Sequence, residues 1–180
     1  MIKDKHTLKR LNILIAILFG ILLFNFVTLS TDSSRRESSR QTTCTSNQKQ
    51  IALLIIIHAQ EDDYKLPAQE DWIKDVTKNG EISGRTLKCP SGADKKRICS
   101  YGYNGHLSGL SVKKFNDKPD RIVLTADSDK DNFILQSTTD ISPRHAINSD
   151  RKNKNRAIIS FVDTHVEAVK TDNFDKIELF

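Results

Sequence analysis

The hydrophobic pattern of the chain is dominated by one uninterrupted apolar run over residues 11–30. The run consists mostly of Leu, Ile, Val and Phe and contains no charged residue. A helix of this length rises about 30 Å, which matches the hydrocarbon thickness of a bilayer. The run therefore predicts a transmembrane helix embedded in membrane lipid. Its anchor positions are Leu11, Ile15, Leu18, Leu22 and Phe26.

The residues before this run predict its orientation in the membrane. Residues 1–10 carry an excess of Lys and Arg, and such flanks stay on the cytoplasmic side of a membrane. We therefore expect a cytoplasmic basic segment over 1–10, a transmembrane helix over 11–30, and export of residues 31–180. The alternative is a secretory signal peptide cleaved near Ser30, and in that case too the bulk of the chain is exported.

A helical pattern continues beyond the apolar run. Residues 31–50 are polar, and then Ile51, Leu54, Ile55 and His58 recur at the spacing of one helix face, with Cys44 upstream on the same stripe. Nothing here forces a break, because residues 8–66 contain no Pro and a single Gly. We predict one helix over about 8–60, whose part from 31 to 62 is a stalk and docking segment. The alternative is a flexible Ser-rich linker over 30–43.

The remaining residues, 63–180, predict one small α+β domain. A short helix is expected over 68–78, where Trp72, Ile73 and Val76 form an apolar stripe. Strands are expected over 100–104 and 121–126, and a hairpin over 157–169. In that hairpin a tight turn at Asp163-Thr164 pairs Ile159 and Phe161 with Val166 and Ala168. The predicted fold class is α+β, with a long helix packed on a small antiparallel sheet.

The charge and the cysteine content of the chain limit its expected partners and disulfides. The net charge is +5, but no aromatic residues interleave with the basic runs, so nucleic acid is not an expected partner. Three cysteines, Cys44, Cys89 and Cys99, lie in the part expected to be exported, where an oxidising compartment permits one disulfide and leaves one thiol over. Cys89 is expected to be oxidised, with Cys44 and Cys99 both open as its partner.

An ordered series of segments resembles a known family. After the apolar helix come RRESSRQTTCTSNQKQIALLIIIHAQEDD, YKLP, KCPS, SYGYN, SPRH and AIISFVDTHVEAV. Together they resemble the pseudopilin-related proteins of type II secretion, in the branch with a C-terminal His and Asp-Gly-His signature. The signature positions here are His145, Asp163 and His165. The resemblance implies a structural subunit of the bacterial inner membrane, with a periplasmic domain that packs against other pilin-like subunits or secretion proteins.

Several positions depart from that family. Lys5 stands where the processing Gly is expected and Arg10 replaces a Glu, so we predict an N-terminus that is neither processed nor methylated. Residues 148–155 form a longer basic loop. Thr164 replaces the Gly of Asp-Gly, so either Thr164 is strained in a type I′ turn or, as we favour, the turn has changed type. The missing processing Gly and Glu favour an alternative function, a tethered binding module that uses residues 101–104 and 127–132 without assembling, whereas the resemblance over the whole chain favours the structural subunit.

Two sets of polar residues invite a chemical interpretation. The alternate carboxylates of Asp127, Asp129 and Asp131 resemble part of a Ca²⁺ loop, but Asn132 and Thr138 do not fit an EF-hand. The alternative is a solvated acidic turn that binds no cofactor. His145, Asp163 and His165 offer too few ligands for zinc, and we expect turn and backbone contacts instead. Because no nucleophile motif or phosphate loop is present, the chain is predicted not to be an enzyme.

Overall fold

The structure is a computed structural model that describes residues 3–92, 96–146 and 154–180. For residues 3–8, 26–34 and 79 it describes the backbone alone. Most of the expected basic loop over 148–155 lies outside the described residues, which resume at Lys154 at the start of a strand.

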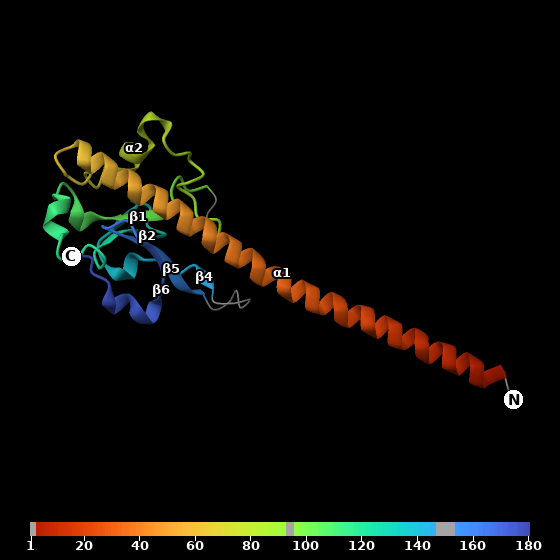
Figure 1. The fold of residues 1–180 in the computed structure, drawn as a ribbon. Coiled ribbons are helices and arrows are strands. Elements are labelled where there is room, and N and C mark those ends of the chain that lie inside the picture. The colour runs from red at the N-terminus through yellow and green to blue at the C-terminus, as the bar shows by residue number, and fades with distance from the viewer. Residues whose placement is uncertain (1–2, 93–95, 147–153) are drawn as a thin grey trace.

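A single helix, α1, runs without interruption from Lys3 to Glu61. Its 59 residues correspond to a length of about 90 Å, and its N-terminal half projects well beyond the domain (Figure 1). The polar stretch for which a flexible linker was the alternative is helical because it contains neither Gly nor Pro. Its Thr hydroxyls donate to carbonyls one turn earlier in the same helix. Helix continuity therefore follows from the absence of any residue that breaks it.

The expected transmembrane helix is not supported. Within the residues that the structure describes, no helix is both long enough and apolar enough to cross a membrane. The prediction of a membrane-spanning helix over 11–30 is therefore wrong. The predictions that depended on it, a single-pass inner-membrane location and a periplasmic domain, are withdrawn with it.

The domain contains one six-stranded sheet with the order β3-β1-β2-β5-β4, while β6 also pairs with β5. The strands are β1 (Tyr101–Asn104), β2 (Val123–Asp127), β3 (Ile134–Leu135), β4 (His145–Ala146), β5 (Lys154–Phe161) and β6 (Val166–Lys170). All pairs are antiparallel except β1 with β3. The fold is α+β, and its sheet is mixed where a purely antiparallel one was expected.

The order of pairing places β5 in the middle of the C-terminal part of the sheet. Ile159 pairs with Ala126 of β2 and also with Glu167 of β6, so these strands lie on opposite sides of β5. Near the other end of β5, Arg156 pairs with His145 of β4. Strands β2 and β4 therefore share one side of β5, and their ends come close together.

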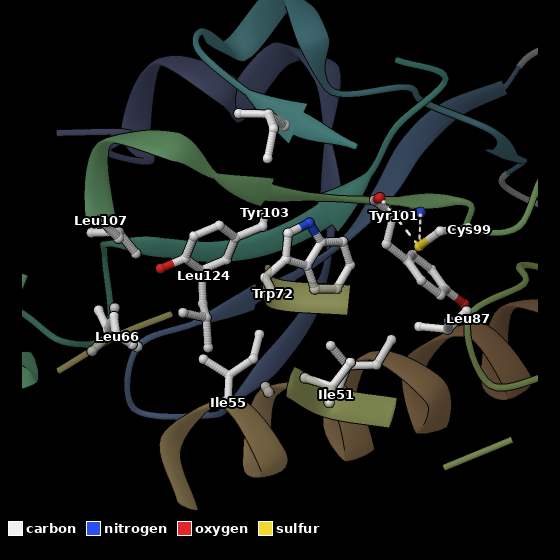
Figure 2. Close-up of a cluster of buried hydrophobic side chains, with 14 of the residues drawn as sticks. Ile51, Ile55, Leu66, Trp72, Leu87, Cys99, Tyr101, Tyr103, Leu107 and Leu124 are labelled. Carbon is white, nitrogen blue, oxygen red and sulfur yellow. Dashed lines mark hydrogen bonds between the residues drawn. The ribbon is translucent and has the colours of Figure 1, made fainter. Parts of the chain in front are cut away.

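Both faces of the sheet are covered. On one face, α1 presents a buried stripe that consists of Cys44, Gln48, Ile51, Ala52, Ile55 and Ala59. Above this stripe, Trp72 of α2 (Trp72–Thr77) stacks on Tyr103 at a centroid distance of 6.1 Å, and Ile51 and Ile55 point towards this layer (Figure 2). On the other face, a smaller cluster gathers around Ile159 and Phe161 beneath the C-terminal 3₁₀ turn over Thr171–Lys176.

One polar side chain within this interface fixes the helix against the sheet. Gln48 is fully buried, donates from Nε2 to the carbonyl of Ile158 at 3.1 Å, and accepts a short hydrogen bond from the hydroxyl of Thr125. The Thr125 hydroxyl in turn lies 2.7 Å from Ser160 Oγ. Because both ends of the amide have partners, Gln48 sets the register of α1 on β2 and β5 at little desolvation cost.

Replacing Gln48 with Met tests this role. The variant Gln48→Met keeps the length of the side chain but leaves the Ile158 carbonyl without its donor, so we expect the free energy of unfolding to fall by about 1–3 kcal/mol. The matched control is Gln50→Met, on the exposed side of the same helix, which should change stability by less than about 0.5 kcal/mol. Urea unfolding of both variants provides the comparison, and equal midpoints would contradict the assignment.

The buried thiol of Cys99 gives the domain a pH dependence. Burial raises the pKa of Cys99 from 9.0 to about 12, although contact with the backbone of Tyr101 partly opposes the shift. Cys99 Sγ lies 3.4 Å from both the amide nitrogen and the carbonyl oxygen of Tyr101 (Figure 2). Above pH 9 the unfolded chain releases this proton while the folded chain keeps it, so stability is lost as the pH rises.

We therefore expect the free energy of unfolding to decline between pH 9 and 12. The contribution of Cys99 to this slope is at most about 1.4 kcal/mol per pH unit. The variant Cys99→Ala should show a shallower decline, whatever its stability at pH 7. Urea melts at a series of pH values measure both slopes, and parallel curves for the two proteins would show that Cys99 does not contribute.

Candidate functional site

Six polar or sulfur-bearing residues gather where α1 first meets the sheet. This buried polar cluster consists of Glu37, Cys44, Cys89, Asp127, Arg144 and His145. Glu37 and Cys44 come from α1, Cys89 from the loop after α2, Asp127 from the end of β2, and Arg144 and His145 from the start of β4. They meet because β2 and β4 lie on the same side of β5, which brings residues far apart in sequence to one end of the helix stripe.

A disulfide between Cys44 and Cys89 lies at the centre of the cluster. The two Cα atoms are 5.3 Å apart, which is within the usual range for a bridged pair. The bond ties α1 to the loop that follows α2. The expected oxidation of Cys89 is confirmed, its partner is Cys44, and Cys99 is the remaining thiol.

The imidazole of His145 links the disulfide to two carboxylates. Its Nδ1 lies 3.3 Å from Glu37 Oε1, and its Nε2 lies 3.4 Å from both Cys89 Sγ and Asp127 Oδ2. Glu37 is itself held by Ser91, whose hydroxyl donates to Oε1 at 3.0 Å. A carboxylate accepts hydrogen bonds, so the Glu37 contact favours the tautomer of His145 in which Nδ1 is the donor.

The carboxylate of Asp127 is only half satisfied. Its Oδ2 accepts a hydrogen bond of 2.7 Å from the amide of Ile158. Its Oδ1 has no hydrogen-bond partner among the described residues, and neither does the nearby Nε of Arg144, at 3.8 Å. Both side chains are buried, where an unpaired polar atom is costly. Asp127 Oδ1 thus has an ion-pair contact with Arg144 but accepts no hydrogen bond from the described residues.

The predicted acidic loop does not bring its carboxylates together. Asp129 pairs with Arg144 at 3.0 Å, and the same guanidinium lies 3.8 Å from Asp127. Asp131 is exposed and lies 3.4 Å from Arg97. Each carboxylate therefore faces an arginine instead of a shared centre that a Ca²⁺ ion would occupy. Of the three expected Ca²⁺ ligands, only Asp127 belongs to the buried polar cluster.

The family-signature residues are also divided between two places. His145 belongs to the buried polar cluster near Glu37, whereas Asp163 and His165 lie in the β5–β6 turn, where Asp163 Oδ1 is 2.5 Å from His165 Nδ1. This turn contacts α1 at Lys49. Positions 37 and 49 are separated by roughly 18 Å along a helix axis. His145 and His165 therefore do not form one site.

Residues 101–104, expected as a binding surface, form the buried strand β1, so they do not present side chains to a ligand. Among the described residues, most of the large exposed apolar side chains lie instead on the projecting half of α1. Its large apolar residues between Leu11 and Phe24 are 51% to 71% exposed. Leu11, Ile15, Leu18 and Leu22 of the expected anchor positions lie there, and the side chain of Phe26 is outside the described residues.

Two members of the cluster were not identified from the sequence. Glu37 lies seven residues before Cys44, which is the spacing of one helix face, so the stripe was a usable signal for it. Arg144 carried no such signal, because its place depends on the path of the chain between β3 and β4. Comparisons of the chain with protein-family models, curated proteins and solved structures find no match.

The β5–β6 turn has changed type, as we favoured, and Thr164 nevertheless has a positive φ, as the alternative required. The loop consists of Val162, Asp163 and Thr164, closed by hydrogen bonds from Thr164 N to Phe161 O and from Phe161 N to His165 O. Thr164 alone in this loop has positive φ, at 70°. The turn is therefore not type I′ but resembles a type I turn followed by a left-handed residue, a position that favours Gly.

We expect Thr164→Gly to raise the free energy of unfolding by about 1 kcal/mol, because it removes the strain of a β-branched residue at positive φ. The control Thr164→Ala keeps the strain and loses the 3.0 Å contact with Lys49 Nζ, so it should not stabilise the domain. Urea unfolding of the wild type and both variants provides the comparison, and a shift in midpoint at an unchanged denaturant slope reports a change in stability. Equal or lower stability of the Gly variant would show that the turn stores no strain.

Proposed function

We propose that this protein is a pilin-like structural subunit whose projecting helix packs against the same helix of other copies. The observation that carries the proposal is the exposed apolar half of α1. Large apolar side chains from Leu11 to Phe24 are more than half exposed on the part of α1 that projects from the domain, and contiguous apolar surfaces of this kind mark interaction sites.

The distribution of these side chains favours several neighbours over one. Consecutive positions such as Ile13, Leu14 and Ile15 point in different directions around a helix, and all three are more than half exposed. A helix that is apolar on all sides is normally buried on all sides. A second copy in a dimer would cover only one stripe. The pattern is therefore best satisfied in a bundle that contains more than two copies.

The attachment of α1 to its domain supports a structural role. The C-terminal half of the helix is fixed by its buried stripe, by the Cys44–Cys89 disulfide and by the Gln48 amide. A subunit that transmits packing from a helical bundle to a surface domain requires such a rigid connection. The domain end of the molecule then decorates the bundle, with the sheet and its loops facing outwards.

The proposal predicts self-contacts along the projecting helix. A photoreactive benzoylphenylalanine in place of Phe19, a conservative change at a position that is 64% exposed, should cross-link the full-length chain to itself in expressing cells. The expected product is a ladder that extends beyond the dimer when analysed by denaturing electrophoresis and mass spectrometry.

The matched control places the same photoreactive residue at Phe180, which is 72% exposed but lies in the domain. There the ladder should be absent or limited to a dimer. Adding Leu14→Lys and Leu18→Lys to the Phe19 probe should abolish the ladder, because bundle packing would then bury two charges. Products of monomer mass only, or cross-links to a different protein, would overturn the proposal.

A further inference from the structure

The buried polar cluster contains a complete set of zinc ligands. Cys44, Cys89, Asp127 and His145 each offer one ligand atom, and these four atoms all lie within 4.8 Å of one another. Cysteine sulfur, imidazole nitrogen and carboxylate oxygen are the ligands of zinc in proteins, and four of them complete a structural site. We propose that reduction of the Cys44–Cys89 disulfide converts this cluster into a binding site for one Zn²⁺ ion.

The distances between ligand atoms suit a tetrahedral ion. Zinc holds sulfur at about 2.3 Å and nitrogen or oxygen at about 2.0–2.2 Å, which separates neighbouring ligand atoms by roughly 3.3–3.8 Å. Nε2 of His145 already lies 3.4 Å from Cys89 Sγ and 3.4 Å from Asp127 Oδ2. Reduction allows the sulfur of Cys44 to move from bonding distance to the spacing that a shared ion requires.

The surrounding residues are those that support a zinc site. Glu37 Oε1 faces Nδ1 of His145 at 3.3 Å, which fixes the ring and directs the lone pair of Nε2 towards the sulfurs. A carboxylate behind a ligating histidine is a common feature of zinc centres. The amide of Ile158 holds Asp127 Oδ2 in place beside His145 Nε2, and Oδ1 faces Arg144 Nε at 3.8 Å.

Charge and burial also fit a closed site. Two thiolates, one carboxylate and Zn²⁺ together carry one negative charge, and the guanidinium of Arg144 lies 3.8 Å from Asp127 to offset it. All four ligand residues are buried, so little space remains for a water ligand. Arg144 Nε, which lacks a hydrogen-bond partner in the disulfide form, faces the most negative part of the loaded site.

The two forms are connected by a balanced exchange. Two equivalents of a small thiol reduce the bond between Cys44 and Cys89: two protein thiols form, and the reductant leaves as its own disulfide. Zn²⁺ then binds both sulfurs and the imidazole Nε2, and the two thiol protons are released to solvent, with any proton on Nε2. The disulfide and the zinc ion are mutually exclusive, and each ties α1 to the same loop.

The test uses the full-length chain, prepared oxidised and reduced under anaerobic conditions, and titrated with Co²⁺ as a spectroscopic substitute for zinc. The reduced chain should bind one equivalent, with the visible bands of tetrahedral cobalt and a thiolate charge-transfer band in the near ultraviolet. Zn²⁺ should displace the cobalt and abolish both signals. The oxidised chain should bind none.

Variants assign the ligands. Cys44→Ser and His145→Ala should each lose the tetrahedral spectrum, whereas Cys99→Ser, which removes the buried cysteine outside the cluster, should retain it. Glu37→Gln should weaken Zn²⁺ binding by about 10- to 100-fold without changing the stoichiometry, as expected for a group that orients a ligand.

Folding is monitored in the same samples by circular dichroism and thermal melts. Zn²⁺ should raise the melting temperature of the reduced wild type and leave that of the oxidised protein unchanged. A reduced chain that is folded but gives no tetrahedral cobalt spectrum would overturn the proposal. So would a reduced chain that unfolds and does not refold when zinc is added, or an unchanged spectrum in both Cys44→Ser and His145→Ala.

Discussion

The contact between the C-terminal half of α1 and the sheet is the constraint on which the rest of the domain depends. The helix stripe buries Ile51 and Ile55 against the sheet, and this apolar burial supplies the driving force. Apolar packing alone allows a helix to slide or rotate by small steps. The hydrogen bonds of Gln48 to Thr125 and to the Ile158 carbonyl remove that freedom, because any shift leaves buried polar groups unpaired.

The same constraint explains why a polar cluster survives in the interior. Once Gln48 fixes the register of α1, Cys44 lies one turn towards the N-terminus, and Glu37 about two turns further. These positions place a cysteine sulfur and a carboxylate against the ends of β2 and β4. Asp127 and His145 meet them there. The disulfide compensates by holding the junction covalently.

The sequence predicted the elements better than their assembly. The continuous helix followed from the lack of Gly and Pro, and the strand at 121–126 followed from its β-branched residues, within one or two positions of β2. The hairpin partners were wrong by one residue: Val166 pairs with Ser160, and Ala168 pairs with Ile158. The loop has three residues instead of two, and its extra residue shifts every pair. The longer loop depends on the positive φ of Thr164, and the amino-acid composition of the segment does not reveal that angle.

Because α1 is unbroken and its C-terminal half is fixed to the domain, the molecule acts mechanically as a lever. The free arm, from Lys3 to about Glu37, is roughly 50 Å long at 1.5 Å per residue. A tilt of about 10° at the clamp therefore displaces the far tip by roughly 9 Å, nearly the width of one helix. Small changes in packing around Cys44 and Gln48 would thus be amplified at the distal end, and a push on the distal end would be felt at the cluster as a small torque.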